Sequence, residues 1–229
     1  MRYLTSALVA EGSSDDDFLP RVIGRSLEEI CAVDFDESID VADVTVLRAA
    51  HGPVGVEAIM RLVAQNAGMF NLVFIHRDQG ANPERVRREW VDPLRGAWGD
   101  RSERLVPIIP VRETEAWLLA DGQALRAALG VRWSDDSMGL PPHPAHVERV
   151  DDPKRVTAEI GRRVRRPLSN YLVRLGELVS LERLSQVPAY REWRAATRNA
   201  LTDLGLRPAE AATARVGGKT RGIRKARAD

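Results

Sequence analysis

The feature that most constrains the fold is a regular alternation of strand-like and helix-like segments in the first half of the chain. Residues 71–76 (NLVFIH) are almost all apolar, which is typical of a strand buried on both faces of a parallel sheet. Three more strands are expected, at residues 3–10, 41–48 and 104–111. Helices are expected at residues 14–32, 54–67, 83–98 and 113–129. This order predicts a parallel α/β sheet flanked by helices, with right-handed crossovers.

The fourth expected strand contains two prolines, Pro107 and Pro110. Proline has no backbone N–H to donate to a neighbouring strand, so within sheets it is confined to edges and strand ends. The fourth strand is therefore expected at an edge of the sheet.

The second half of the chain contains helical patterns alone. Residues 131–151 form a loop rich in Pro, Asp and His. After this loop, apolar residues recur at helical spacing in residues 153–165, 168–184 and 188–205. We therefore expect three parts, namely an α/β domain at residues 1–130, a helical C-terminal appendage at 131–206 and a flexible basic tail at 207–229.

Composition excludes several classes of protein. A single cysteine, Cys31, rules out an internal disulfide framework and a cysteine-based zinc cluster. No run of about 18 apolar residues is present, so no membrane span is expected. The N-terminal stretch lacks the layout of a secretory signal, because its apolar residues run straight into acidic ones. We therefore expect a cytoplasmic protein with no membrane partner. Its oligomeric state is left open.

The net charge of +1 is a cancellation of two opposite charges. Residues 215–229 carry six basic side chains and one acidic side chain, so this stretch has a net charge of +5 and the rest of the chain −4. A basic tail of this kind suits contact with a phosphate backbone, although it is equally consistent with a solvated terminus. Near-neutral total charge therefore does not exclude nucleic acid as a partner.

Acidic residues follow three of the expected strands. Glu11 follows the first strand, Asp78 the third, and Glu113 and Glu115 the fourth. Ligands of parallel sheets bind outside the carboxyl ends of the strands, so these side chains are expected on one rim. Gathered carboxylates repel one another unless a cation joins them, and hard oxygen ligands favour Mg²⁺. The pattern predicts an Mg²⁺ or Mn²⁺ site suited to phosphodiester chemistry.

Several aspartates near the proposed site also have a simpler interpretation. Asp15, Asp16 and Asp17 fall in the first turn of an expected helix, where Ser14 and Asp17 resemble a capping box. We favour capping for the three aspartates. Asp78 is also placed to cap the next helix or to pair with Arg77. Asp152 and Pro153 equally suit the start of a helix, with proline at its first position.

Four motifs resemble a known family. They are E-G-S-S-D at 11–15, F-I-H-R-D-Q-G at 74–80, V-R-E-T-E-A-W-L-L-A-D at 111–121 and D-D-P-K at 151–154. Together they are similar to a bacterial TOPRIM-like family of unknown function (domain of unknown function family 4276), distantly similar to the TOPRIM domains of OLD-type nucleases. TOPRIM domains have a Glu after the first strand and an Asp-x-Asp after the third. Here Gly80 stands where the second Asp is expected, so one carboxylate is missing.

The resemblance implies a TOPRIM-like sheet and an Mg²⁺-dependent nuclease, placed in a bacterial defence or mobile-element system. In that reading three carboxylates, with Glu113 as a substitute, hold the metal and carry catalysis: Glu11, Asp78 and Glu115. Three side chains would neutralise the substrate phosphate: His76, Arg77 and Lys154. The alternative is a non-catalytic binding module with a degraded metal site that serves a partner ATPase. A third reading is a phosphotransfer or nucleotide-binding enzyme for small molecules on the same rim.

Overall fold

The computed structural model of the chain describes residues 1–12, 14–48, 55–78 and 82–209. The fold is α/β, as the sequence predicts, and its main sheet is parallel. The four strands of this sheet are, in spatial order, β4 (Thr45–Val46), β2 (Ser6–Val9), β5 (Leu72–His76) and β6 (Arg104–Ile108). A smaller parallel pair extends it, formed by β1 (Arg2–Leu4) and β3 (Ile39–Val41). The proline-containing strand β6 lies at an edge, as expected.

Strand β5 is the best-covered part of the sheet. All five of its residues are buried, and it pairs with β2 on one side and with β6 on the other. Phe74, for example, lies opposite both Leu8 and Val106. This double pairing explains the almost unbroken apolar run in the sequence, because neither face of the strand meets water.

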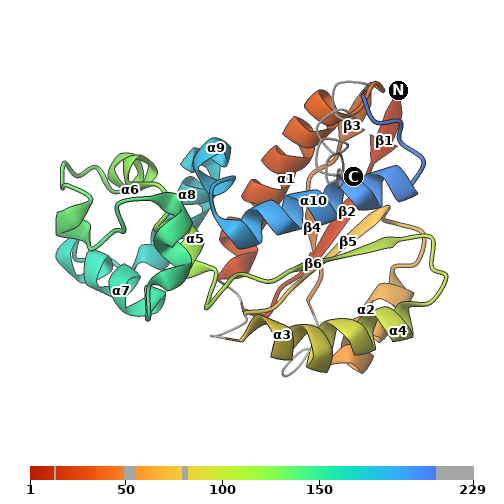
Figure 1. Ribbon diagram of the computed structural model, residues 1–229, viewed down its shortest axis with the longest axis horizontal. Coiled ribbons are helices and arrows are strands. Elements are labelled where there is room, and N and C mark those ends of the chain that lie inside the picture. The colour runs from red at the N-terminus through yellow and green to blue at the C-terminus, as the bar shows by residue number, and fades with distance from the viewer. Residues whose placement is uncertain (13, 49–54, 79–81, 210–229) are drawn as a thin grey trace, which may run out of the picture.

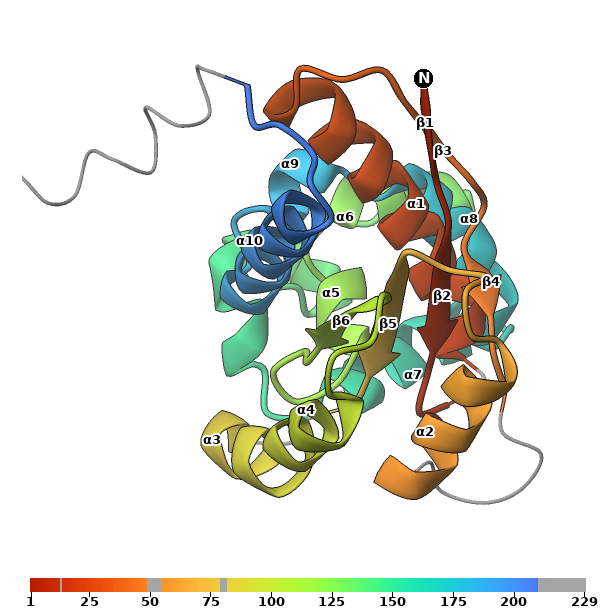
Figure 2. The ribbon, with the colours of Figure 1, turned by 90° about the vertical axis from the view of Figure 1, so that its right-hand side faces the viewer.

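Helices cover both faces of the sheet (Figures 1 and 2). One face packs against α1 (Asp15–Asp34) and α10 (Pro188–Asp203), and α8 (Leu172–Leu178) packs in turn against α1. The other face packs against α2 (Val56–Gln65) and a segment made of α3 (Pro83–Val86), the π-helical turn η1 (Arg87–Val91) and α4 (Asp92–Trp98). Each layer buries its own hydrophobic cluster against the strands.

The second half of the described chain is helical, as predicted. Its α-helices are α5 (Glu115–Leu118), α6 (Gly122–Leu129), α7 (Pro153–Arg163), α8, α9 (Leu181–Leu184) and α10. Short 3₁₀ turns join them at η2 (Asp136–Met138), η3 (Pro144–Arg149) and η4 (Leu168–Tyr171). Continuous helices were the expectation for residues 113–129 and 168–184, and that expectation is wrong, since each stretch is interrupted.

Asp121 explains both interruptions. Its carboxylate accepts the backbone N–H groups of Gln123 and Ala124, at 3.0 and 3.2 Å, and so caps α6. Its second oxygen accepts the N–H of Ser180 at 2.9 Å, just where α8 has ended. The Ser180 hydroxyl in turn accepts the N–H of Arg183 at the start of α9. Side-chain caps therefore replace helical hydrogen bonds at both breaks.

Helix α10 returns to the sheet and closes its core. The ring centroid of Trp193 on this helix lies 5.8 Å from that of Phe74 on β5. Tyr190 packs edge-on against Trp117, at 5.3 Å between centroids. Residues on both sides of position 130 thus share one hydrophobic cluster, and the three-part division of the chain stays a prediction.

The described chain ends beside the last turn of α1. Pro208 forms an antiparallel bridge with Phe35, and the Ala209 N–H donates to the Asp34 carbonyl at 2.9 Å. The basic stretch 215–229, expected to be flexible, lies outside the described residues. Among the helices that the structure describes, none is long and apolar enough to cross a membrane.

Candidate active site at the carboxyl ends of the strands

Glu11 and Asp78 are brought together by two neighbouring strands. Glu11 lies two residues after β2, Asp78 lies two residues after β5, and these strands pair in parallel. The Asp78 backbone N–H donates to Glu11 Oε2 at 2.9 Å. Glu11 and Asp78, both predicted from the sequence as metal ligands, are therefore adjacent on the rim.

His76 is the buried centre of this cluster. It is the last residue of β5 and is 2% exposed. Its Nδ1 lies 3.5 Å from Asp15 Oδ2, and its Nε2 lies 3.3 Å from Asp78 Oδ1. Burial by itself lowers the pKa of His76. The hydrogen bond with Asp78 and the charges of the surrounding carboxylates outweigh it, so that its pKa is raised above its usual value.

The burial of His76 gives it a different role from the one expected. The sequence suggests that it holds a substrate phosphate. In the structure its side chain is enclosed, and Nε2 also lies 2.9 Å from the Thr114 hydroxyl. We therefore assign His76 as a positioning residue that fixes Asp15, Asp78 and Thr114.

Asp15 belongs to the site, although we assigned it to helix capping. Its side chain is buried, and its Oδ2 accepts the Gly12 N–H at 3.2 Å as well as facing His76. Ser14, at the N-cap of α1, makes no side-chain capping bond, so the predicted capping box with Asp17 is wrong. Burial raises the pKa of Asp15, and the charge of His76 offsets this only in part. The sequence feature that could have placed Asp15 in the site is Gly12, where the chain turns back toward the strand end.

Residues after β6 complete the cluster from the other side. The Thr114 N–H donates to Asp78 Oδ1 at 3.0 Å, and its hydroxyl lies 3.4 Å from the same oxygen. Two residues earlier, Arg112 has a φ of 69°, a left-handed conformation that turns the chain here. Thr114 is a contact that sequence reasoning missed, because a threonine carries no charge signal.

These contacts keep Asp78 ionised. Burial by itself raises its pKa, but the hydrogen bond and charge of His76, the Thr114 N–H and the charge of Lys154 lower the pKa below its usual value. Asp78 is thus held as a carboxylate at the middle of the rim.

Lys154 reaches the cluster from the first turn of α7. Its Nζ lies 3.0 Å from Glu113 Oε1 and 3.9 Å from Asp78 Oδ2. Burial lowers the pKa of Lys154, but its hydrogen bond to Glu113 and the nearby carboxylates raise the pKa overall. Asp152 caps α7 by accepting the Arg155 N–H at 2.8 Å, which confirms the simpler reading of Asp152 and Pro153 as a helix start. That helix start also places Lys154 at the rim.

Glu115 and Arg77 lie at the margins of the cluster. Glu115, the first residue of α5, is half-buried and lines a neighbouring cavity with Lys154. Burial raises the pKa of Glu115 above its usual value. The guanidinium of Arg77 lies 5.4 Å from the ring centroid of Trp90, on the α4 side of the sheet. The expected phosphate contact of Arg77 stays a prediction.

The donor chemistry of the rim suits a hard cation. Glu11, Asp78 and Glu113 supply carboxylate oxygens, and Glu113 Oε2 is buried without a hydrogen-bond partner among the described residues. A buried, unpaired carboxylate oxygen calls for a cation or a donor. Within the same ranges, no group of three or more His, Cys, Asp or Glu side chains is arranged so that it could hold a metal ion. The rim carries carboxylates of the kind that bind a hard cation, and the Lys154 ammonium contacts Glu113 and faces Asp78. Gly80, where an acid was expected, lies outside the described residues.

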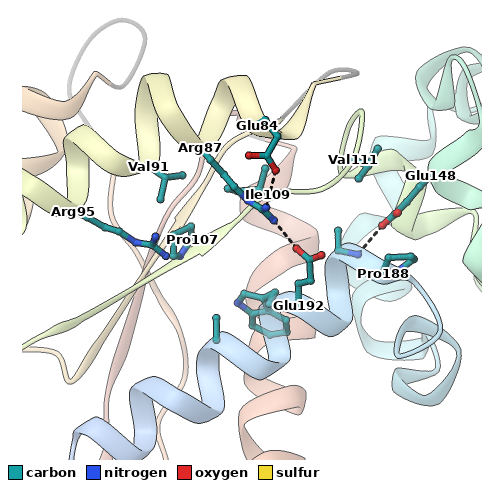
Figure 3. Close-up of a pocket in the computed structure, with 13 residues that line it drawn as sticks. Glu84, Arg87, Val91, Arg95, Pro107, Ile109, Val111, Glu148, Pro188 and Glu192 are labelled. Carbon is teal, nitrogen blue, oxygen red and sulfur yellow. Dashed lines mark hydrogen bonds and ion pairs between the residues drawn. The ribbon is translucent and has the colours of Figure 1, made fainter. Parts of the chain in front are cut away.

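A separate cavity of about 320 Å³ lies between η1 and α4, β6 and α10 (Figure 3). Several of its charged groups already have partners. Arg87 contacts Glu84 at 3.2 Å and Glu192 at 2.7 Å, while Glu148 accepts the Ala189 N–H at 2.7 Å. None of the residues proposed from the sequence lines it. The carboxylate rim therefore remains the candidate site.

Comparisons of the chain with protein-family models, with curated proteins and with solved structures give no match. The resemblance to TOPRIM-like proteins therefore stays a prediction that depends on the four sequence motifs.

Proposed function

We propose that this protein hydrolyses phosphodiester bonds in nucleic acid with the help of Mg²⁺ or Mn²⁺. The observation that carries the proposal is the hydrogen bond from the Asp78 backbone N–H to the Glu11 carboxylate, which joins two acidic residues that follow neighbouring strands. Glu113 lies on the same rim, linked to Asp78 through Lys154. A cluster of hard oxygen ligands beside a cationic side chain suits a metal and a phosphate together.

Each residue of the cluster has a distinct proposed role. Glu11, Asp78 and Glu113 would hold the cation, which when bound supplies positive charge to the phosphate and lowers the pKa of a water molecule. Lys154 would neutralise a phosphate oxygen as charge develops on it. His76 orients Asp78 from inside the protein. Glu115, whose pKa burial raises above its usual value, would give a proton to the leaving oxygen.

A cleavage assay tests this function. End-labelled single-stranded DNA, double-stranded DNA and RNA are incubated with the full chain in Mg²⁺, in Mn²⁺ and in EDTA. Cleavage of at least one substrate is expected with a divalent cation and not with EDTA, and Glu11→Gln should abolish it. Glu57→Gln, on the exposed face of α2, is the matched control and should cleave like the wild type. Equal cleavage by the wild type and Glu11→Gln would contradict the proposed site.

A specific observation favours a second function, a binding module without catalysis. The ammonium of Lys154 already neutralises Glu113 and faces Asp78, so these carboxylates are partly satisfied without a metal. Such a domain would bind a phosphate-containing partner and serve another protein, such as the ATPase that the sequence resemblance implies. Nucleic-acid binding in EDTA without cleavage in either cation would favour this function over the first.

A further inference from the structure

A second cavity adjoins the carboxylate cluster in the helical half of the chain. It has a volume of about 730 Å³ and lies between α7 and the turn η4. Glu115 and Lys154 form part of its wall, and Lys154 also contacts Glu113 and faces Asp78. The cavity and the rim are thus contiguous through one side chain. Its volume falls within the range of about 300 to 1,000 Å³ that is common for small-ligand sites.

The wall of this cavity is strongly basic. Four cationic side chains line it against the single acid Glu115: Lys154, Arg162, Arg165 and Arg166. Lys154 and Arg162 are already paired, the latter with Glu159 on the same helix. Arg165 and Arg166 are exposed and make no ion pair within the part of the chain that the structure describes. Two guanidinium groups are therefore available to an anionic ligand, and arginine suits bidentate contact with phosphate.

The backbone holds Arg165 in a conformation that glycine usually adopts. Its φ is 57°, and it stands where α7 ends. The Arg166 N–H donates to the Gly161 carbonyl at 3.0 Å, and the Arg165 N–H donates to the Arg162 carbonyl at 3.1 Å. These two bonds form a Schellman motif, whose left-handed position is normally glycine because a side chain is strained there. The chain nevertheless carries an arginine at this position, and this residue lines the cavity.

The floor of the cavity is small and apolar. Ala158, Pro167 and Leu168 contribute to it, together with Gly161. A Cβ atom on Gly161 would meet the Arg166 carbonyl oxygen at 3.0 Å and the Leu168 nitrogen at 3.2 Å. Glycine is therefore needed for the loop to approach α7 closely and form this floor. Apolar residues beside two arginines that make no ion pair within the described residues suit a ligand with an aromatic part and an anionic part.

We propose that this cavity binds one nucleoside phosphate, with the phosphate on Arg165 and Arg166 and the base and sugar against the apolar floor. Inorganic phosphate would use the guanidinium groups alone, and an uncharged nucleoside would use the floor alone. A nucleoside monophosphate uses both and should bind more tightly than either. Under the proposed function, on which this one step rests, the ligand is the substrate nucleotide next to the cleaved phosphate, because Lys154 lines both sites.

Calorimetric titration of the full chain in EDTA tests the proposal. The ligands are the four common ribonucleoside 5′-monophosphates, the matching nucleosides and inorganic phosphate. At least one monophosphate should bind about tenfold or more tightly than its nucleoside and than phosphate. Arg165→Gly and Arg166→Ala should each weaken that binding by about tenfold. Arg174→Gln, on the exposed surface of α8 outside the cavity, should bind like the wild type.

Arg165→Gly also distinguishes weaker binding at the cavity from weaker binding caused by loss of folding. Glycine relieves the left-handed strain, so the melting temperature of this variant should equal or exceed that of the wild type while its affinity falls. The proposal is overturned if no monophosphate binds more tightly than inorganic phosphate, or if Arg165→Gly and Arg166→Ala bind like the wild type.

The two proposals fail in different ways. Nucleotide binding is measured without a divalent cation, and Glu11→Gln should retain it. Binding that depends on Arg165, in a protein that cleaves no nucleic acid, supports the cavity and contradicts the nuclease. Metal-dependent cleavage with unchanged nucleotide affinity in Arg165→Gly and Arg166→Ala supports the nuclease and contradicts the cavity.

Discussion

The ammonium of Lys154 lies 3.0 Å from Glu113 Oε1 at the edge of the carboxylate cluster. It is also 3.9 Å from Asp78 Oδ2, so one side chain supplies positive charge to two proposed metal ligands. A divalent cation at the same carboxylates would compete with this ammonium. In the proposed reaction the displaced ammonium would be free to contact a phosphate oxygen.

This competition makes the response of Lys154→Gln to metal informative. Without metal, Asp78 and Glu113 lose their shared cation, so the melting temperature in EDTA should fall below that of the wild type. Added Mg²⁺ then has no competing ammonium, and the rise in melting temperature that it causes should be larger in the variant. Thermal denaturation with and without Mg²⁺ measures both. A smaller rise in the variant would mean that Lys154 helps to hold the cation.

Divalent cations should stabilise the wild-type protein through Glu11 and Asp78. A cation that binds the folded state alone at a hundred times its dissociation constant adds about 2.7 kcal/mol to the free energy of unfolding. For a chain of this length the melting temperature should rise by about 5 to 10 °C. Glu11→Gln should lose this rise, whereas Glu57→Gln should keep it. A rise that is the same in all three proteins would place the cation elsewhere.

The stability of the metal-free protein should depend on pH through His76. Its pKa in the folded state is raised, so the folded protein binds more protons than the unfolded chain between the two pKa values. This stabilisation is complete below the unfolded pKa of about 6.5 and is lost as the pH rises through the folded pKa. The slope for one proton is at most about 1.4 kcal/mol per pH unit.

Urea denaturation in EDTA at several pH values measures this slope. In the wild type the free energy of unfolding should decline from pH 6.5 upward, and His76→Gln should flatten the decline. If both proteins show the same pH dependence, the raised pKa of His76 is not coupled to folding.

Asp121→Ala should destabilise the helical half. The substitution removes the acceptor for the backbone N–H groups of Gln123, Ala124 and Ser180, the first two of which belong to the first turn of α6. Lost capping and newly unpaired N–H groups should together cost about 2 to 3 kcal/mol of the free energy of unfolding. Asp100→Ala, at an exposed loop position, should change it by less than about 0.5 kcal/mol. A similar cost for both would show that the caps contribute little.

The sequence predicted the parts of the fold that depend on local pattern. The apolar run at 71–76 was predicted as a doubly buried strand because every residue of it must be apolar if both faces are covered. Pro107 correctly indicated an edge strand. The breaks at Asp121 and Ser180 were not predictable from periodicity, because apolar spacing continues across them while the side chains of these two residues cap the starts of new helices.

The candidate site was also predicted only in part from the sequence. Glu11 and Asp78 were predicted because each lies just beyond the end of an apolar strand, and parallel strands place such residues on one rim. Asp15 and Thr114 were not predicted as site residues, because their contacts depend on the turns at Gly12 and Arg112 rather than on sequence spacing. The role of His76 also depended on burial, which a single polar residue at a strand end does not reveal.

The most direct test of the central proposal is the single-turnover rate of Mn²⁺-dependent cleavage by Asp78→Asn. The substitution keeps the size of the side chain but removes the charge that would hold the cation. Asp17→Asn, an exposed acid in the first turn of α1, is the matched control. The proposed function predicts that Asp78→Asn cleaves at least about a hundredfold more slowly than the wild type while Asp17→Asn is unaffected. A cleavage rate for Asp78→Asn equal to that of the wild type would contradict it.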